Sequence, residues 1–576
     1  MKRMLLRGPI PVRLILASLI LVSPTLRAQE DTVSRAMHDE MRRSMEKLRL
    51  EQLEKPYFIS YLIVDNESKE AAATLGSVLT SSESHTRSLE VTVRVGDYQL
   101  DNSHFLSVKS GFEIPQLGRV THMPLDDDYN EFRRQIWLAT DRAYKTALQD
   151  LSGKRAALQG INRNENTADF SKTPSVSITD LGPRTDLDLQ KAARLVRDAS
   201  AAFRQAPWIQ TSRVDLFADD RLERYLNSEG STFTRRVPQV SLRITASTQA
   251  ADGMPLEDFV TLYGYSMQDL PSGAVVLSRI HELEDELGKL QAAPVADRYE
   301  GPVLFEGSAA AEVFARYFAA LLPATPNLVV SSNAQSLHMA LPSNGLRDRL
   351  GLRVLPDFID VVDDPTATHE RDGLLFGGYK ADEEGVASKR TLVVEHGVLK
   401  TVLTSRAPVQ GVLESTGNMR ERAVAPSNLF ISSDKSLLAG ELRKQLIESA
   451  KSDGYPYGII VRRLSGKLAT LTYRVYEDGH EELLRNAAIA DLNSSSFKRI
   501  RAVSDQRVIY TEAAQVRSPS QINMNLPSVS GSQLQGWKPL VSYVVPSLLF
   551  DEVTVEKPSG EITKPTVIDS PLLEKQ

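Results

Sequence analysis

Residues 299–314 read Tyr-Glu-Gly-Pro-Val-Leu-Phe-Glu-Gly-Ser-Ala-Ala-Ala-Glu-Val-Phe, and the character of the sequence changes at this stretch. It opens with an apolar run from Val303 to Phe305, which is typical of a strand. It continues with small residues around Ala309, which favour the start of a helix. The pattern predicts a strand that passes directly into a helix.

Upstream of this stretch, segments with helical and with strand periodicity alternate. Residues 33–53 place methionine and leucine at helical spacing, and a second helix is expected over residues 126–151. Tyr57–Val64 is a nearly continuous apolar run, and Leu89–Val95 alternates apolar and polar residues with period two, as strands do. This mixture predicts an N-terminal α/β region over residues 29–298.

Two further segments complete that region. Residues 152–182 are rich in Asn, Ser, Thr and Lys, so we interpret them as a linker or mobile loop. Thr185 is the expected cap of a helix whose apolar face runs from Leu189 to Ala199. A later helix is expected around Leu277–Leu290.

Downstream of the stretch, short β-rich segments alternate with turn clusters, and helices become rare after Ala320. One helix, Leu438–Ala450, interrupts them. This spacing predicts a large, mostly antiparallel C-terminal β domain over residues 299–556, followed by a loose tail at 557–576. The predicted fold class is therefore α+β, an N-terminal α/β region followed by the C-terminal β domain.

The first 28 residues have the pattern of an export signal. A basic segment precedes the apolar run Leu14–Val22, which is too short to span a bilayer, and Ala28 offers a small residue for cleavage. We expect cleavage after Ala28 and a periplasmic or extracellular protein without stable membrane insertion. An uncleaved membrane anchor is the alternative.

Composition excludes several classes of function. The 576 residues carry a formal net charge of −6, and their Lys and Arg residues are dispersed, so no nucleic-acid partner is expected. The chain contains no cysteine. It therefore forms no disulfide and offers no thiolate as metal ligand or nucleophile.

Several segments together suggest a known family. They are, in order, residues 299–314, Val361–Asp364, Asp382–Gly385, Lys389–Lys400, Ser415–Arg420, Ala425–Leu429 and Tyr543–Val555. Each pattern is weak alone, but their order and spacing resemble the TldD/PmbA family of modulator-type metallopeptidases. The likeness covers roughly residues 185–556 and implies a two-part architecture and dimers.

The resemblance also locates the family's zinc site. Active members carry a His-Glu-x-x-x-His helix here and draw a further ligand from a cysteine near the C-terminus. This chain has Phe305 and Ala310 in place of the two histidines, keeps Glu306, and has Asn523–Gly531 in the cysteine region. Because a hydrolytic zinc site needs three protein ligands, the resemblance implies that zinc is lost and that no cofactor is bound.

Other residues could take over such chemistry. No two of the nine histidines lie four or five residues apart, and His369 is the one expected near the old site. Glu306 and Glu312, if both lie on the helix, face different sides and cannot act as an acid–base pair. Glu306 is instead interpreted as a carboxylate at a helix N-terminus, where the helix dipole favours it.

A second candidate site is the loop at Ser415–Arg422. Gly417 and Asn418 permit a tight turn, from which Arg420 and Arg422 could reach a peptide carboxylate or carbonyl. The candidate peptide-binding residues are Ser415, Thr416, Gly417, Asn418, Arg420 and Arg422. A purely structural hairpin is the alternative.

These observations lead to one main hypothesis and two alternatives. The resemblance implies a non-catalytic subunit that binds extended peptide or unfolded polypeptide, or that completes the chamber of an active TldD-like partner in a homodimer or heterodimer. One alternative is an active metallopeptidase with displaced zinc ligands. The other is a binding or scaffold protein of the export compartment unrelated to proteolysis.

Overall fold

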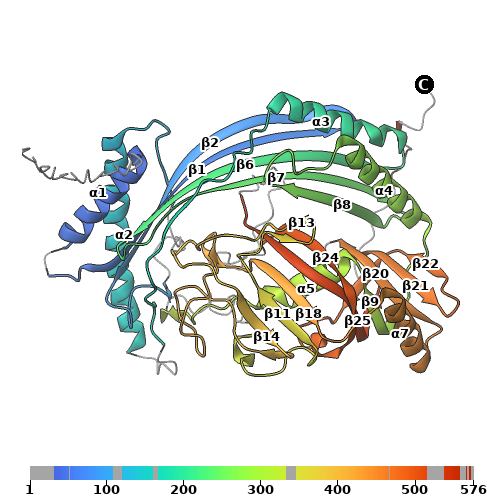
Figure 1. Ribbon diagram of the computed structural model, residues 1–576. Helices are drawn as coiled ribbons and strands as arrows, with labels where there is room; N and C mark the ends of the chain where they lie inside the picture. The colour runs from blue at the N-terminus through green and yellow to red at the C-terminus, as the bar shows by residue number, and fades with distance from the viewer. Residues whose placement is uncertain are drawn as a thin grey trace, which may run out of the picture.

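The computed structural model describes residues 31–50, 52–107, 120–159, 167–332, 345–465, 468–514 and 537–557, with residues 566, 568, 570 and 571. A curved seven-stranded sheet arches over a second sheet of twelve strands (Figure 1). Helices flank both sheets, and most strand pairs are antiparallel. The predicted α+β class is confirmed.

Two helices cover one end of the arch. α1 (Thr32–Lys47) is capped by the Asp31 carboxylate, which accepts a hydrogen bond from the backbone N–H of Ser34 at 2.8 Å. α2 (Tyr129–Leu158) begins after the equivalent cap Asp128. Their apolar faces pack on β1 and β2. The helix expected over residues 33–53 thus ends earlier, at Lys47, and α2 extends to Leu158.

The arch itself is built from long strands in the order β4-β2-β1-β6-β7-β5, with β8 paired to β7. Their bounds are β1 (Pro56–Thr74), β2 (Ser77–Val95), β4 (Thr121–His122), β5 (Ser177–Asp180), β6 (Thr211–Asn227), β7 (Thr232–Gln249) and β8 (Pro255–Gly264). Only the β5–β7 pair is parallel among these described strands. On the convex side, α3 (Leu189–Ala201) and α4 (Gly273–Ala292) bury their apolar faces on the sheet (Figure 1).

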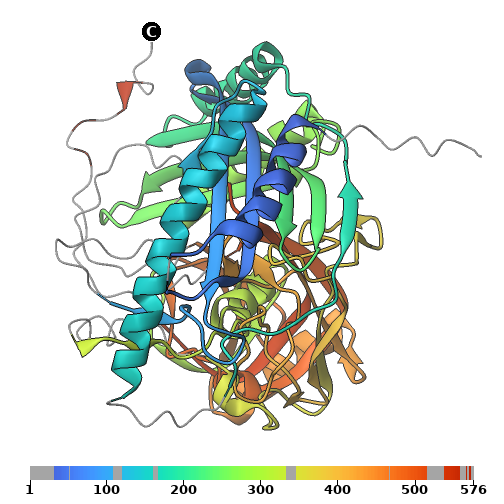
Figure 2. The same ribbon diagram turned by 90° about the vertical axis from the view of Figure 1, so that its left-hand side faces the viewer.

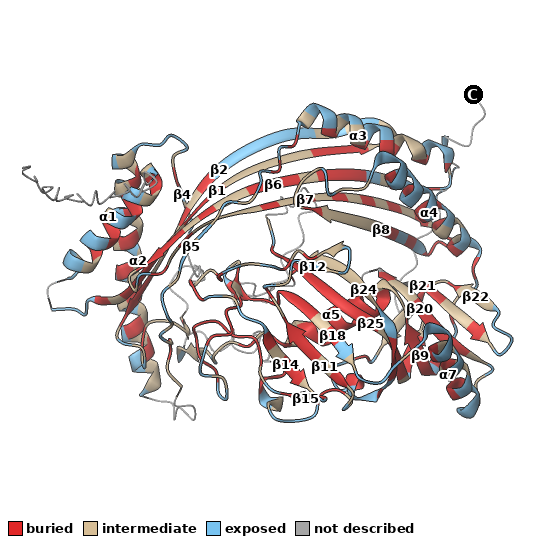
Figure 3. Cartoon of the chain, in the orientation of Figure 1, coloured by how far each residue is buried: buried red, intermediate tan, exposed pale blue. Residues whose placement is uncertain are grey.

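The second sheet has the order β15-β14-β11-β18-β25-β23-β21-β20-β9, with β19, β22 and β24 attached beside it. Its strands are β9 (Tyr299–Phe305), β11 (Ile359–Asp363), β14 (Thr391–Glu395), β15 (Val398–Leu399), β18 (Asn428–Ser433), β19 (Ser436–Leu437), β20 (Tyr457–Ser465), β21 (Leu468–Tyr476), β22 (Glu481–Leu484), β23 (Ala487–Ala490), β24 (Ile500–Ala513) and β25 (Leu540–Glu556). Two helices, α5 (Ser308–Tyr317) and α7 (Ala439–Ser452), pack against it. Figure 3 shows its central strands as mostly buried.

Short pairings complete the described structure. They are β3 (Phe105–Leu106) with β10 (Val329–Val330), β12 (His369–Glu370) with β13 (Gly373–Leu374), and β16 (Met419–Arg420) with β17 (Ala423–Val424). Single turns of 3-10 helix occur at Ala202–Gln205, Ala319–Leu321, Arg347–Arg349 and Ser496–Arg499. The loop that carries β12 and β13 lies on the side of the second sheet that faces the arch (Figures 1 and 3). The turn between β16 and β17 reaches the arch through Arg422, which contacts Glu90 of β2.

Two local expectations need correction. The stretch 152–182 is no free linker over its described parts, because it begins inside α2, buries Phe170 and contributes β5. The polar composition misled because Lys154 and Asp169, both buried, form an ion pair with each other at 2.6 Å. The cap of α3 is Asp188, which accepts from two backbone N–H groups, rather than Thr185.

Other expectations fall outside the described residues or are not decided by them. The predicted signal peptide at 1–28 and the region Asn523–Gly531 lie outside, as does most of the predicted tail. Over the described ranges, no helix combines the length and apolar character that a membrane span requires.

Candidate functional site

The predicted strand–helix junction at residues 299–314 is present as β9 followed by α5. Gly307 lies between them with φ of 57°, a left-handed value that glycine adopts at little cost, and α5 then starts at Ser308. Glu306 therefore precedes the helix and does not share its surface with Glu312. The sharp turn points Phe305 and Glu306 into different surroundings.

Phe305 and Ala310, the positions aligned with the family's histidines, are both completely buried in the C-terminal core. The Phe305 ring meets Phe550 edge to face at a centroid distance of 5.5 Å. Phe497 packs on Phe550 in turn, at 5.3 Å. Aromatic and methyl groups therefore fill the space where two imidazoles would be needed.

Glu306 is held by two arginines. Arg443 of α7 donates to both carboxylate oxygens, at 2.8 and 3.0 Å, and Arg462 of β20 donates at 3.2 Å. Arg462 also donates to Glu481 at 2.8 Å. Burial alone would raise the pKa of Glu306, but the two guanidinium groups lower it below its usual value. The expected support from a helix N-terminus is thus replaced by side-chain ion pairs.

Glu312 has the opposite electrostatic environment. It lies within α5, is buried, and accepts a hydrogen bond from the backbone N–H of Leu464 at 3.1 Å. Burial raises the pKa of Glu312 to about 7. This buried, internally bonded carboxyl supports the packing of α5 against β20.

The residues at this junction do not fit a zinc ion. Zinc sites in proteins use imidazole, thiolate and carboxylate ligands, whereas here one carboxylate is shared by two fixed cations and its neighbours are apolar. Within the described ranges, no three His, Cys, Asp or Glu residues are grouped so that they could hold a metal. His369 lies in β12, exposed, and contacts Thr368.

The loop Ser415–Arg422 uses most of its polar groups internally. Thr416 exchanges hydrogen bonds with Thr404, and the Asn418 amide donates to the buried Asp363 carboxylate at 2.8 Å. The Ser415 hydroxyl accepts from the N–H of Gly417, which adopts a φ of 77°. These contacts support the structural alternative for this part of the loop.

Arg420 and Arg422 differ sharply. Arg420 is buried and donates to the carbonyl oxygens of Pro426 and Leu540. Arg422 is partly exposed and donates to Glu90 of β2 at 2.7 Å, so it joins the C-terminal region to the arch. Arg420 cannot reach a peptide without breaking internal bonds, and peptide binding by this loop stays a prediction for Arg422 and the backbone.

Sequence reasoning did not predict a cluster of buried charges that lies where the C-terminal loops meet the arch. Glu223 of β6 lies between Arg221 and Arg235, at 2.5 and 2.6 Å, and is completely buried. Arg221 also contacts Glu421 at 3.1 Å, and Arg235 approaches Glu383 at 4.0 Å. The loops of the C-terminal region therefore dock on the arch through ion pairs.

Two carboxyls in these loops have strongly shifted pKa values. Burial is the main cause that raises the pKa of Asp382 to about 7, and the nearby charge of Glu384 raises it further. Burial is also the main cause that raises the pKa of Glu383 to about 7, with a further contribution from the charges of Glu421 and Glu223. The Asp382 carboxylate accepts from the N–H groups of Glu384, Val386 and Met419, so it organises the turn.

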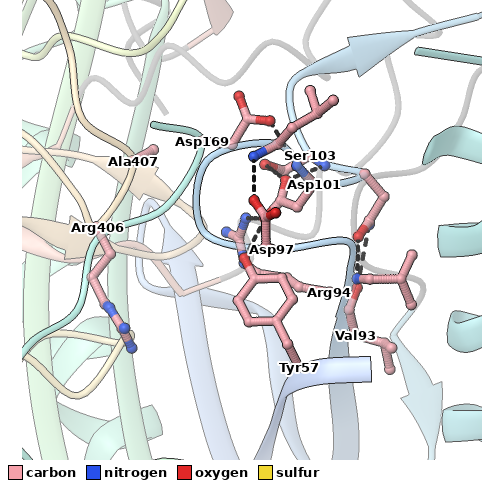
Figure 4. Close-up of polar contacts among 12 residues, drawn as sticks. Tyr57, Val93, Arg94, Asp97, Asp101, Ser103, Asp169, Arg406 and Ala407 are labelled. Carbon is pink, nitrogen blue, oxygen red and sulfur yellow. Dashed lines mark hydrogen bonds and ion pairs between the residues drawn. The ribbon is translucent and has the colours of Figure 1, made fainter. Parts of the chain in front are cut away.

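A second polar cluster secures the end of the arch (Figure 4). The buried Asp101 carboxylate accepts from Arg94 at 2.8 Å and from Tyr57 at 2.7 Å. Burial alone would raise the pKa of Asp101, but the Arg94 guanidinium holds it well below its usual range. Arg406, also fully buried, donates to the carbonyl oxygen of Ser171 and pairs with Glu229. This contact fixes the C-terminal region to the 167–176 segment.

Comparison with known proteins places this geometry in context. Residues 298–557 match the family model described as the PmbA/TldA metallopeptidase C-terminal domain. A metalloprotease of Methanocaldococcus jannaschii is 42% identical over 91 residues, which cover 15% of this chain and 19% of that protein. A metalloprotease of Methanothermobacter thermautotrophicus is 27% identical over 284 residues, which cover 48% of this chain and 57% of that protein. The chain thus spans well under two thirds of these two relatives.

Solved structures share the fold at low sequence identity. TldE from Thermococcus kodakarensis aligns with a TM-score of 0.53 at 14% identity, covering 90% of this chain and 100% of that one. A candidate modulator of a DNA gyrase from Thermotoga maritima aligns with a TM-score of 0.55 at 14% identity, covering 86% and 96%. These alignments extend over both sheets of the present structure.

Fold and sequence together define a metallopeptidase-like α+β protein. Residues 298–557 carry the sequence of a PmbA/TldA metallopeptidase C-terminal domain, and the chain shares the fold of the two solved structures.

Proposed function

We propose that this protein is an exported, non-catalytic TldD/PmbA-type subunit. In this role it binds extended peptide or completes the chamber of an active metallopeptidase partner. The observation that carries the proposal is the state of Glu306, which is engaged by Arg443 and Arg462 beside the buried Phe305 and Ala310.

The chemistry of that arrangement disfavours hydrolysis by this chain alone. A zinc-dependent peptidase needs ligands for the ion and a carboxylate free to take a proton from water. Here the carboxylate has a lowered pKa and is committed to two guanidinium groups. Two fixed positive charges next to it would also repel a divalent cation.

Binding of extended peptide is supported by the edge of the arch. Among the described strands, β8 (Pro255–Gly264) pairs with β7 alone, so its second edge presents main-chain donors and acceptors. An extended peptide can pair with such an edge without any catalytic residue. In Figure 1, β8 is the arch strand above β13 and β24 of the C-terminal region.

A mixing experiment tests the proposal. Peptide cleavage is measured for this chain alone, for a TldD-type subunit with an intact His-Glu-x-x-x-His helix, and for the mixture. We expect cleavage to require the second subunit, and the mixture to differ from that subunit alone in rate or peptide preference. Chelator-sensitive cleavage by this chain alone would instead favour displaced zinc ligands. A mixture identical to the second subunit alone would favour the scaffold alternative.

Metal content and location are measured separately. We expect no stoichiometric zinc in protein purified without chelator. One zinc per chain with a Kd tighter than about 1 μM, corresponding to roughly 8 kcal/mol, would contradict the proposal. Cell fractionation should recover the protein outside the cytoplasm, cleaved after Ala28.

A further inference from the structure

α1 and α2 form the outermost layer at one end of the arch, where they lie side by side (Figure 2). They run in the same direction, as three successive contacts show. The Arg35 guanidinium lies 4.5 Å from the Tyr129 ring centre, Arg133 donates to Glu40 at 2.7 Å, and Arg43 lies over Trp137. Each helix buries one face on the sheet, so the opposite faces form a single outward surface.

This outward surface, here called the α1–α2 face, is rich in basic side chains. It carries Arg35, Arg42, Arg43, Arg134, Arg142 and Lys145, all exposed, and the carboxylates Asp39, Glu46, Glu131 and Asp141. Apart from the buried Lys154 and Glu40, the two helices contain nine Lys and Arg residues and five Asp and Glu residues, whereas the whole chain has a net charge of −6. The face therefore carries a small net positive charge on an otherwise acidic protein, although Arg42, Arg43, Arg134 and Lys145 also pair with carboxylates of their own helix.

The α1–α2 face also exposes large apolar side chains. Trp137 and Leu138 are adjacent on α2 and remain 44% and 36% exposed. Leu50 and Leu53, which follow α1, are 43% and 48% exposed. Trp137 and Leu138 lie next to Arg134 and Arg142 in the helical repeat, so apolar and basic groups alternate over one surface.

We propose that the α1–α2 face binds an anionic lipid surface, holding the protein on a membrane without insertion. Basic residues with tryptophan and leucine on one helical face suit the interface of a bilayer, where charge meets lipid headgroups and rings enter the headgroup layer. If the protein is exported, as proposed above, the predicted leader ends at Ala28, close to the α1 cap Asp31, and α1 is the first helix to follow it. This inference does not depend on the peptidase question.

Vesicle co-sedimentation of the exported form tests the proposal. We expect binding to vesicles that mix phosphatidylglycerol into phosphatidylcholine, weaker binding to phosphatidylcholine alone, and release at high salt. Each basic residue near an anionic surface strengthens binding about fivefold. Combining Arg42→Gln, Arg142→Gln and Lys145→Gln should therefore reduce binding by at least about tenfold. Trp137→Gln with Leu138→Gln should reduce it at low salt, where the parent protein binds.

The opposite side of the molecule offers a matched control. The exposed residues Leu438, just before α7, and Lys444 and Lys451, on α7, supply one apolar and two basic side chains, 61%, 76% and 67% exposed. A variant with Leu438→Gln, Lys444→Gln and Lys451→Gln should bind vesicles like the parent protein. Circular dichroism checks that every variant is folded.

Three outcomes would overturn the proposal. One is equal binding to charged and neutral vesicles, and another is equal loss of binding in the α1–α2 and α7 variants. The third concerns proteins, since a second copy or a partner subunit could also cover this face. If the α1–α2 variants lower the assembly's mass in lipid-free solution but leave vesicle binding unchanged, the face is a protein interface.

Discussion

The two sheets of this protein are held together by different forces. The C-terminal sheet surrounds one large apolar cluster in which the aromatic rings of Phe305, Phe497 and Phe550 meet. The arch has apolar clusters under its helices, but buried ion pairs cross its middle, with Glu223 between Arg221 and Arg235. The C-terminal loops dock on that polar middle.

This difference assigns separate tasks to the two regions. Apolar burial is insensitive to pH and depends mainly on shape, so the C-terminal sheet provides a stable body. A buried ion pair depends on both partners and on their protonation, so the contact between arch and loops responds to single charges. The comparison predicts that substitutions in the C-terminal core lower stability by leaving a cavity. Substitutions at the contact between the arch and the C-terminal loops should lower it by leaving a buried charge without its partner.

The largest effect is expected in the C-terminal core. Phe305→Ala removes a fully buried ring and leaves a cavity, which should lower the free energy of unfolding by about 3–5 kcal/mol. Urea denaturation measures the change. Leu413→Ala, at a position 65% exposed, is the control and should stay within about 0.5 kcal/mol of the parent protein. Similar losses in both variants would remove the packing argument.

The polar junction should respond nearly as strongly to one charge. Glu223→Gln leaves two buried guanidinium groups without their shared carboxylate and should cost about 3 kcal/mol. Glu67→Gln removes a partner from the exposed pair with Arg184 and should cost less than about 1 kcal/mol. Denaturation of both variants under one condition gives the comparison, and equal costs would contradict the proposed difference between the sheets.

The third prediction concerns pH. The pKa values of Asp382 and Glu383 are raised to about 7 in the folded protein, from 3.8 and 4.5. The folded state therefore binds these protons more tightly than the unfolded state does. This contribution to stability is complete below the unfolded values and is lost as pH rises through about 7.

Hydrogen exchange provides the measurement. Amides of the 382–386 turn should exchange faster from open states at about pH 8 than at about pH 5, after correction for the intrinsic pH dependence. Glu383→Gln should reduce the trend, because one of the two titrating side chains is removed while Asp382 still titrates. An unchanged trend in that variant would show that other groups control the junction.

The smallest effect is expected at Glu306. Its carboxylate is 15% exposed, and both arginine partners are partly open to solvent, so Glu306→Gln should cost about 1 kcal/mol. Partner-dependent peptide cleavage should be nearly unchanged. A general base would lose about a hundredfold or more in rate. A loss of that size, in a variant with unaltered folding, would show that Glu306 takes part in chemistry.

Local patterns predicted the elements whose faces are apolar. The methionines of α1 and the alternation of Leu89–Val95 identify a helix and a strand, because one side of each packs on a core. The strand–helix junction at 299–314 was equally visible. Where the buried residues are apolar and regularly spaced, the sequence alone is enough to predict the helix or strand.

Polar burial was not predictable in the same way. β1 continues to Thr74, ten residues beyond the apolar run that ends at Val64, because its polar second half stays paired with β2 and β6. Within it, the Asp65 carboxylate forms ion pairs with Arg87 of β2 and Arg224 of β6. The arginines that engage Glu306 lie 137 and 156 residues downstream. No local spacing in the sequence reveals such partners, so the ion pairs of Glu306 could be identified only from the three-dimensional structure.

The place of β25 in the second sheet has a consequence for the order of assembly. β25 pairs with β18, β23, β24 and β9, all of which precede it in the chain. Because the chain is synthesised from its N-terminus, these strands cannot complete their pairing in the second sheet until Leu540–Glu556 has been made. A growing chain should therefore stay open and protease-sensitive until its last long strand is available. Pulse proteolysis of a chain stopped before Leu540 would measure this delay.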